Sequence, residues 1–215
     1  MENPVPSSSS SGNPAPTYEQ THRKVLQNYK KSFRHYLLTS RFNTYTWSEN
    51  RRYREHHPGI GCLYCCPDGI SQSIPIDSIL FVLEMDNDNN KILGVGMVRN
   101  RSSNKKHYVY TNGNYNRYVY VGATRIDRED MTEEEDTIMR VFDILCFTGN
   151  RHMKRGQGLK SFPVDILYKC SVKIDLVGFI RDMFKRRIVE NRIVEDRNVE
   201  DRIVDGKNTS DDTMA

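Results

Sequence analysis

Hydrophobic residues recur at the spacing of an amphipathic helix in separate stretches of the chain. The first stretch follows Thr17 and Gln20, which have the spacing of a capping box, and its apolar positions predict a helix over residues 18–39. The second follows Thr132 and has acidic residues in its first turn, where the helix dipole favours negative charge. A last stretch runs from Leu176 to Phe184. We therefore expect helices before, within and after the rest of the fold.

Strands are predicted where apolar residues run without a helical period. The runs Ile79–Met85 and Lys91–Val98 flank the turn-rich segment Asp86–Asn90, which is typical of a β-hairpin. Gly94 and Gly96 lie inside the second run. Glycines at such positions indicate a bend or the close approach of another backbone, as in a coiled sheet or a small barrel.

A second hairpin is predicted from His107–Thr111 and Tyr115–Val121, which flank Asn112–Asn114. Strand alternation places the tyrosines of each run on one face, so an aligned register gives a tyrosine stripe. Tyrosine rows pack against helices more often than they stack bases, and both interpretations stay open.

The remaining segments complete a single domain. Residues 41–75 are irregular and predict loops with one or two short strands, and Val164–Tyr168 predicts a further short strand. We expect a disordered tail over residues 1–17, one α+β domain over residues 18–186 and a low-complexity tail of degenerate five-residue repeats over residues 187–215. The domain is expected to contain a twisted, mainly antiparallel sheet or a small barrel, with flanking helices.

Composition adds a modest positive charge and excludes a membrane span. The chain of 215 residues has a formal net charge of +4, and its basic excess is concentrated between Tyr18 and Ile60. That excess fits an acidic partner or the solvated face of a helix. No apolar run approaches the roughly 18 residues that a membrane helix needs. Five cysteines without an export signal favour reduced thiols in a cytosol-like compartment.

The loop Thr148–Pro163 is the strongest candidate for a binding site. It combines four cations, a histidine and three glycines, and such a loop can bring backbone N–H groups and positive side chains to a phosphate. It matches no phosphate-loop motif. The candidate nucleic-acid-binding residues in this loop are Arg151, His152, Lys154, Arg155, Gly156, Gly158 and Lys160.

Outside that loop, the candidates for base or sugar contacts are Arg117, Tyr118 and Trp47. Trp47 lies among basic residues, which suits base stacking, but a single tryptophan also serves as a core anchor.

Candidates for metal binding and catalysis are weaker. Cys62 and Cys65 have the spacing of a zinc half-site, but the other half is missing, so we predict buried cysteines and neither a metal nor another cofactor. His152 could act as an acid or base with Asp143 or Asp165 in phosphodiester chemistry. No nucleophile with a base accompanies it, and we assign no catalytic residue.

Several segments together resemble an uncharacterised protein family of large nucleocytoplasmic DNA viruses of the mimivirus kind. They are Phe81–Met85, Lys91–Gly96, Tyr115–Tyr120, Arg125–Arg128 and His152–Gly158. This resemblance implies a viral protein in the host cytoplasm or the virion, and carries no established activity. The Lys91–Val98 strand with its paired glycines is also similar to the PUA-like group of EVE, ASCH and YTH domains. That likeness implies a PUA-like barrel that binds RNA or modified bases.

The sequence therefore predicts a non-catalytic protein that binds nucleic acid, RNA in preference to DNA, through the basic glycine-containing loop. No membrane partner is expected. A first alternative is a viral structural or scaffold protein that contacts other viral proteins. A second is a phosphodiester-processing enzyme that uses His152. If the chain is not viral, a cytoplasmic location is expected.

Overall fold

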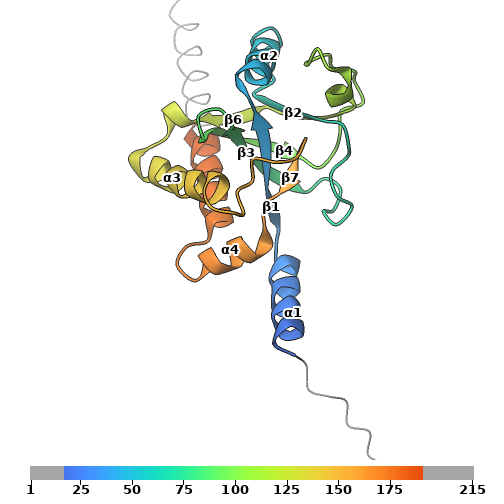
Figure 1. The fold of residues 1–215 in the computed structure, drawn as a ribbon. Helices are drawn as coiled ribbons and strands as arrows, with labels where there is room; N and C mark the ends of the chain where they lie inside the picture. The colour runs from blue at the N-terminus through green and yellow to red at the C-terminus, as the bar shows by residue number, and fades with distance from the viewer. Residues whose placement is uncertain (1–16, 191–215) are drawn as a thin grey trace, which may run out of the picture. The chain divides into compact units, whose positions relative to one another are not determined.

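A computed structural model of the chain describes residues 17–190, and the chain divides into two compact units, Met1–Phe33 and Arg34–Ala215. The described part of the first unit is mainly helix α1, Tyr18–Lys31 (Figure 1). The predicted capping box is present, because the backbone N–H of Gln20 donates to Thr17 Oγ1 and that of Thr17 to Gln20 Oε1. The start of this helix is confirmed.

The predicted end of the first helix, at residue 39, is wrong. The helix ends at Lys31, and residues His35–Phe42 form strand β1. This segment pairs with strands on both sides, and its buried side chains gain more from that pairing than from a local helical period.

The second unit contains a five-stranded sheet with the order β6-β4-β3-β1-β7 and a separate two-stranded ribbon of β2 and β5. Beyond β1, the strands are β2 (Cys62–Cys66), β3 (Ile79–Asp86), β4 (Lys91–Arg99), β5 (Tyr118–Gly122), β6 (Thr124–Asp127) and β7 (Lys160–Ser161). The β3–β4 hairpin is antiparallel as predicted, whereas β1 and β3 run parallel. The α+β class is confirmed, and the sheet does not close into a barrel.

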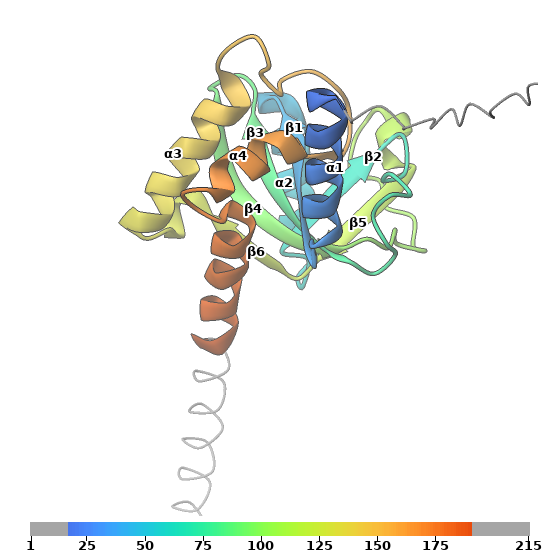
Figure 2. The ribbon, with the colours of Figure 1, turned by 90° about the horizontal axis from the view of Figure 1, so that it is seen from below.

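Helices cover one face of this sheet and the ribbon covers the other (Figures 1 and 2). The helices on the first face are α3 (Glu133–Phe147), α4 (Val164–Ser171) and a closing helix over residues 176–190. On that face, Phe81 of β3 stacks on Phe184 with ring centroids 5.2 Å apart. On the other face, Leu80 and Val82 pack with the ribbon residues Cys62 and Tyr64 in one core cluster.

Gly96 lets the ribbon approach the sheet closely. A Cβ at this position would lie 1.9 Å from Tyr64 Oη and 2.9 Å from Cys62 Cβ, so any side chain would push β2 away from β4. The predicted close approach at these glycines is confirmed.

Helix α2, Thr44–Glu55, lies in the region that the sequence assigns to loops and short strands, and that assignment is wrong for α2. Asn43 caps the helix, because its Oδ1 accepts the N–H of Thr46 and its own N–H donates to Thr46 Oγ1. A threonine thus takes the place of the usual Glu or Gln of a capping box, so the familiar pattern is absent from the sequence.

The second predicted hairpin is wrong. Residues 107–111 form no strand, β5 pairs with β2, and the turn is the short helix η1, Gly113–Asn116. The side chain of Asn116 accepts the N–H groups of Val109 and Tyr110 and donates to the carbonyl of Tyr110. These hydrogen bonds use backbone N–H and C=O groups that would otherwise pair with a partner strand. Residues 107–111 therefore do not pair as a strand, and the predicted tyrosine stripe does not form.

The remaining elements complete the comparison with the sequence. The start of α3 with its capping box is confirmed, and a second short helix, η2, covers Arg128–Asp130. The predicted strand at Val164–Tyr168 is wrong, since these residues lie in α4, and a short apolar run alone does not distinguish strand from helix. The closing helix is confirmed and continues to residue 190, beyond the predicted boundary at 186. Residues 1–16 and 191–215, which include most of both predicted tails, lie outside the described residues.

Helices in the described part of the chain are too short or too polar to cross a membrane.

Candidate functional site

The glycine-containing loop joins α3 to β7 and is anchored to helix α3 and to strand β2 of the ribbon. The N–H of Met153 donates to the carbonyl of Cys146, and the N–H of Leu159 donates to Cys66 Sγ. Gly158 has φ +63°, and a Cβ there would lie 3.0 Å from Cys66 Cβ. Backbone conformation and space therefore both favour glycine at this position, and the loop is held against β2.

The four cations of the loop differ in their partners. Arg151 pairs with Asp165 at 2.9 Å. Lys154 Nζ donates to Asn90 Oδ1 at 2.8 Å. Arg155 and Lys160 are exposed and form no ion pair with any carboxylate of residues 17–190. These two side chains are therefore the ones most available to an external anion.

His152 is half-buried, and its Nδ1 is buried without a hydrogen-bond partner in the described part of the chain. The alternative catalytic acids, Asp143 and Asp165, are engaged elsewhere: Asp143 accepts from Arg128, and Asp165 accepts from Arg151. The structure thus supplies no acid–base pair at His152.

A cavity of about 190 Å³ lies beside the loop, between the ends of β1 and β3 and the start of α2. Its walls include Arg41, Asn87, Tyr110, Tyr115 and the segment 156–158. The loop glycines thus form one wall of a concave site, and two tyrosines from the region between β4 and β5 form another.

Arg41 is the cation in this cavity wall. Its Nε donates to the carbonyl of Met153, while its Nη1 is buried without a partner. Burial lowers the pKa of the Arg41 guanidinium, and the nearby Cys146 thiol opposes that effect. No carboxylate in residues 17–190 pairs with Arg41, although buried charges in proteins are normally paired.

Asn87 contributes an unused acceptor to the same cavity. Its Nδ2 donates to the carbonyl of Lys154 at 3.0 Å, which fixes the orientation of the amide, because a carbonyl can only accept. The Oδ1 atom is buried and has no partner in the described part of the chain. Arg41 and Asn87 therefore present one unpaired donor and one unpaired acceptor.

The helix start that borders the cavity already holds a carboxylate. Asp88 Oδ2 accepts the N–H and the hydroxyl of Thr44 at the beginning of α2. These hydrogen bonds lower the pKa of Asp88, and the charge of Lys154 lowers it further. Because Lys154 acts on Asp88 and donates to Asn90, it is a weaker candidate for an external phosphate than Arg155 or Lys160.

Trp47 lies in α2 and is half-buried against the core. Its ring meets Phe42 edge-on at 5.0 Å, and the guanidinium groups of Arg54 and Arg125 lie 5.3 and 5.2 Å from its centroid. The indole is therefore engaged by its neighbours, which favours the role of a core anchor over that of a free stacking surface.

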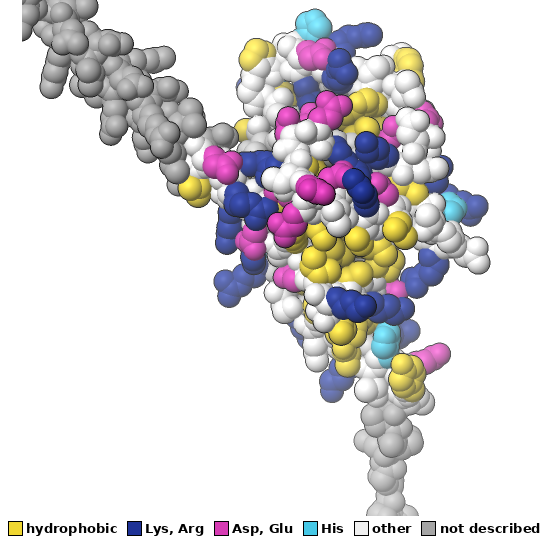
Figure 3. Space-filling model, turned by 90° about the vertical axis from the view of Figure 1, so that its left-hand side faces the viewer, with side chains coloured by type: hydrophobic (Ala, Val, Ile, Leu, Met, Phe, Trp, Pro, Cys, Tyr) yellow, Lys and Arg dark blue, Asp and Glu magenta, His cyan; other side chains and the backbone are white. Residues whose placement is uncertain are grey.

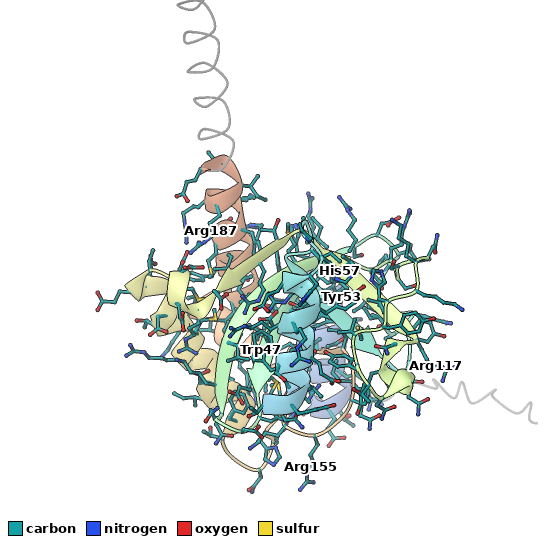
Figure 4. The ribbon with its side chains drawn as sticks, turned by 90° about the horizontal axis from the view of Figure 1, so that it is seen from above. Trp47, Tyr53, His57, Arg117, Arg155 and Arg187 are labelled. Carbon is teal, nitrogen blue, oxygen red and sulfur yellow. The ribbon has the colours of Figure 1, made fainter. Side chains whose placement is uncertain are left out.

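Tyr118 begins β5, and Arg117 directly precedes the strand. Tyr118 pairs in register with Cys66, which in turn contacts Gly158 and Leu159, so this tyrosine lies close to the end of the loop. Arg117 is exposed, and Figure 4 shows it, Trp47 and Arg155 at three separate places. The structure thus brings together the loop residues and Tyr118, but does not bring Arg117 and Trp47 to the same site.

A wider cleft of about 550 Å³ is lined by Trp47, Arg51, Lys91, Asp127 and other residues. Several of its charged groups form ion pairs: Arg51 with Glu55, Asp127 with Arg125, and Arg128 with Asp136 and Asp143 of α3. Arg54 forms no ion pair within residues 17–190, but it donates to Asn50 and to the carbonyl of Gly61. The face that carries α3 also mixes Lys and Arg with Asp and Glu (Figure 3). The smaller Arg41 cavity is therefore the better candidate, because its cation has a buried nitrogen without a hydrogen-bond partner within residues 17–190, whereas none of the cations that line the wider cleft has one.

The cysteines do not form a metal site. Cys62 belongs to the core cluster between ribbon and sheet, whereas Cys65 belongs to the cluster on the outer side of the ribbon. Three residues apart in a strand, they point to opposite faces and cannot share an ion. Burial raises the pKa of Cys62 to about 12 and that of Cys66 to about 11, which disfavours the thiolate. Within residues 17–190 no cluster of three His, Cys, Asp or Glu side chains is arranged to hold a metal.

Sequence reasoning missed Arg41 and Asn87. Arg41 follows the apolar residues Tyr36–Leu38 and precedes Phe42 in β1, but the segment was assigned to the end of a helix and a loop. Comparison of the chain with protein-family models, with curated proteins and with solved structures finds no match.

Proposed function

We propose that this protein binds single-stranded nucleic acid at the Arg41 cavity and the adjoining loop, RNA in preference to DNA, and without catalysis. The observation that carries the proposal is Arg41, a partly buried guanidinium without a carboxylate partner in the described part of the chain. An uncompensated buried cation costs stability, so its retention is best explained by an anionic or strongly polar ligand.

The surroundings of the cavity support a nucleic acid over a small free anion. Arg155 and Lys160 lie in the loop that forms one wall, are exposed and lack ion pairs within residues 17–190. Tyr110 and Tyr115 line the same cavity. Cations that follow a phosphate backbone next to aromatic rings are the usual means of binding single strands.

The experiment measures the salt dependence of binding. A fluorescent single-stranded RNA of eight residues is titrated with the full chain, and fluorescence anisotropy is recorded at several salt concentrations. Each neutralised phosphate of a single strand contributes about 0.7 to the slope of log affinity against log salt. We expect the double variant Arg155→Ala/Lys160→Ala to flatten that slope by about 1.4.

The matched control removes two other exposed lysines, Lys169→Ala/Lys173→Ala, which lie at α4 on the helical side of the sheet (Figure 2). It makes the same change in net charge and should keep the wild-type slope. Wild-type protein that does not bind RNA or DNA, or equal slopes in both double variants, would remove the loop from the proposed role.

The place of action belongs to the same proposal. The resemblance to a viral family supports the host cytoplasm or the virion, with other viral proteins as further partners. Co-purification of the intact chain, before and after a high-salt wash, tests this part: nucleic acid released by salt supports the main proposal, and retained proteins support a scaffold role.

A further inference from the structure

We infer that the Arg41 cavity reads a keto base, guanine or uracil, from a single strand. Arg41 would donate to the carbonyl oxygen of the base, and Asn87 Oδ1 would accept its ring N–H. This inference rests on the proposed function and adds the chemical class of the ligand that enters the cavity.

The size and lining of the cavity favour a base over a whole nucleotide. Its volume of about 190 Å³ lies below the roughly 300–1,000 Å³ of pockets that enclose a complete small ligand. Tyr110 and Tyr115, whose rings meet edge-on with centroids 6.0 Å apart, both line it. Aromatic walls suit a planar ring, since unpaired bases are commonly held against aromatic side chains.

The unpaired atoms favour a base over a phosphate. A phosphodiester offers acceptors only, so it could satisfy Arg41 Nη1 but would leave Asn87 Oδ1 without a donor and place two oxygens together. A base edge offers an acceptor and a donor side by side. It could therefore satisfy both buried atoms, which are not hydrogen-bonded to each other.

The orientation of Asn87 narrows the choice of base. Asparagine usually reads adenine with its amide donor and acceptor together, but the donor of Asn87 is already used by the carbonyl of Lys154. Only the acceptor remains, in a cavity that Arg41 also lines, and arginine pairs preferentially with base carbonyl oxygens such as guanine O6. Guanine and uracil have a carbonyl oxygen adjacent to a ring N–H, which matches this pair.

The test compares two eight-residue RNAs of alternating sequence, (GU)4 and (AC)4, which contain only keto and only amino bases. Binding is measured by fluorescence anisotropy with the full chain. We expect (GU)4 to bind about tenfold more tightly than (AC)4. Arg41→Met removes the donor, and Asn87→Leu removes the acceptor. Each should bring the ratio toward one, whereas the control Arg140→Met, at an exposed residue of α3, makes the same charge change and should leave the ratio unchanged.

The outcomes separate this inference from the proposed function. Equal binding of the two RNAs with a normal salt slope overturns the base reading and leaves the function standing. A tenfold ratio that persists in Arg41→Met places base recognition elsewhere and also overturns the inference. Absence of binding to both RNAs overturns the function itself. If Asn87→Leu does not fold, Arg41→Met alone decides between these results.

Discussion

Replacing Glu135 with Gln should destabilise the fold strongly, although it exchanges only an oxygen for a nitrogen. The Glu135 carboxylate in the first turn of α3 is fully buried, with 0% of its side chain exposed. It accepts hydrogen bonds from Arg187 at 2.6 Å, from Arg186 at 2.8 Å and from the N–H of Thr132 at 3.1 Å. The carboxylate therefore holds the closing helix, residues 176–190, against α3.

The magnitude follows from the pKa of Glu135. Burial alone would raise this pKa, but the hydrogen bonds from Arg187, Arg186 and Thr132 outweigh burial and lower it to about 2 from an ordinary value of 4.5. That difference corresponds to roughly 3 kcal/mol of folding free energy at neutral pH. Because the folded-state pKa is depressed, this stabilisation is complete above pH 4.5 and is lost as the pH falls toward 2.

The assay is denaturant unfolding of Glu135→Gln beside Glu134→Gln, an exposed neighbour whose replacement makes the same charge change. At pH 7 the first variant should be less stable than the second by roughly 3 kcal/mol. The gap should fall by about half between pH 6 and pH 3, since Glu135 of the unfolded chain becomes protonated below pH 4.5 while the folded carboxylate stays largely ionised. Equal stability of the two variants at pH 7, or a gap that does not change with pH, would refute the reasoning.

Two further predictions concern buried groups. Arg41→Met should change the free energy of unfolding by only about 1 kcal/mol, because loss of the hydrogen bond to Met153 is offset by removal of an unpaired charge. Arg125→Met should lower the free energy of unfolding by about 3–5 kcal/mol, because it leaves the Glu84 carboxylate without its arginine. Thermal unfolding measures both variants, and a large loss of stability in Arg41→Met would show that Arg41 is a structural residue. In the native protein at pH 8, a thiol reagent should modify Cys170 first, since the other four cysteines are buried. Mass spectrometry of the modified chain identifies the site, and equally fast modification of Cys62 would contradict this prediction.

Local signals in the sequence were sufficient where a segment's own residues decide its structure. The capping boxes at Thr17 and Thr132 satisfy helix N–H groups within one turn, and both helix starts are confirmed. The β3–β4 hairpin is likewise set by its turn and by two apolar runs. In these cases the energetic reason lies within about ten residues.

Segments that depend on distant partners were not predicted. Strand β1 has apolar positions that also fit a helix, and only its pairing with β3 and β7 selects the strand. Residues 107–111 have the composition of a strand but are held by the single side chain of Asn116. A pattern of polar and apolar residues does not reveal that a single side chain takes the place of a partner strand.

The same distinction between local signals and distant partners applies to the residues of the candidate site. The loop was found because its cations and glycines are contiguous in sequence, but the buried half of the site comes from Arg41 on β1 and Asn87 in the turn after β3. The segment of β1 was expected to be the end of a helix followed by an irregular region, so Arg41 was assigned to that irregular region and not to a strand. Recognising Arg41 would have required the strand, and the strand is defined only by its neighbours in the sheet.

The topology of the sheet explains why the cavity lies where it does. β1 and β3 are parallel, and their register ends with Arg41 opposite Met85 and Phe42 opposite Asp86, so the carboxyl ends of both strands meet at one edge. In sheets with parallel strands, the crevice beyond these ends is where ligands most often bind, because each chain must leave the sheet there. β1 leaves into the start of α2, and β3 leaves into the turn that contains Asn87. At this edge Arg41 is therefore surrounded by backbone that is leaving the sheet. The loop segment that lines the cavity with it contains Gly156 and Gly158, which carry no charge, so Arg41 has no carboxylate partner in the described structure.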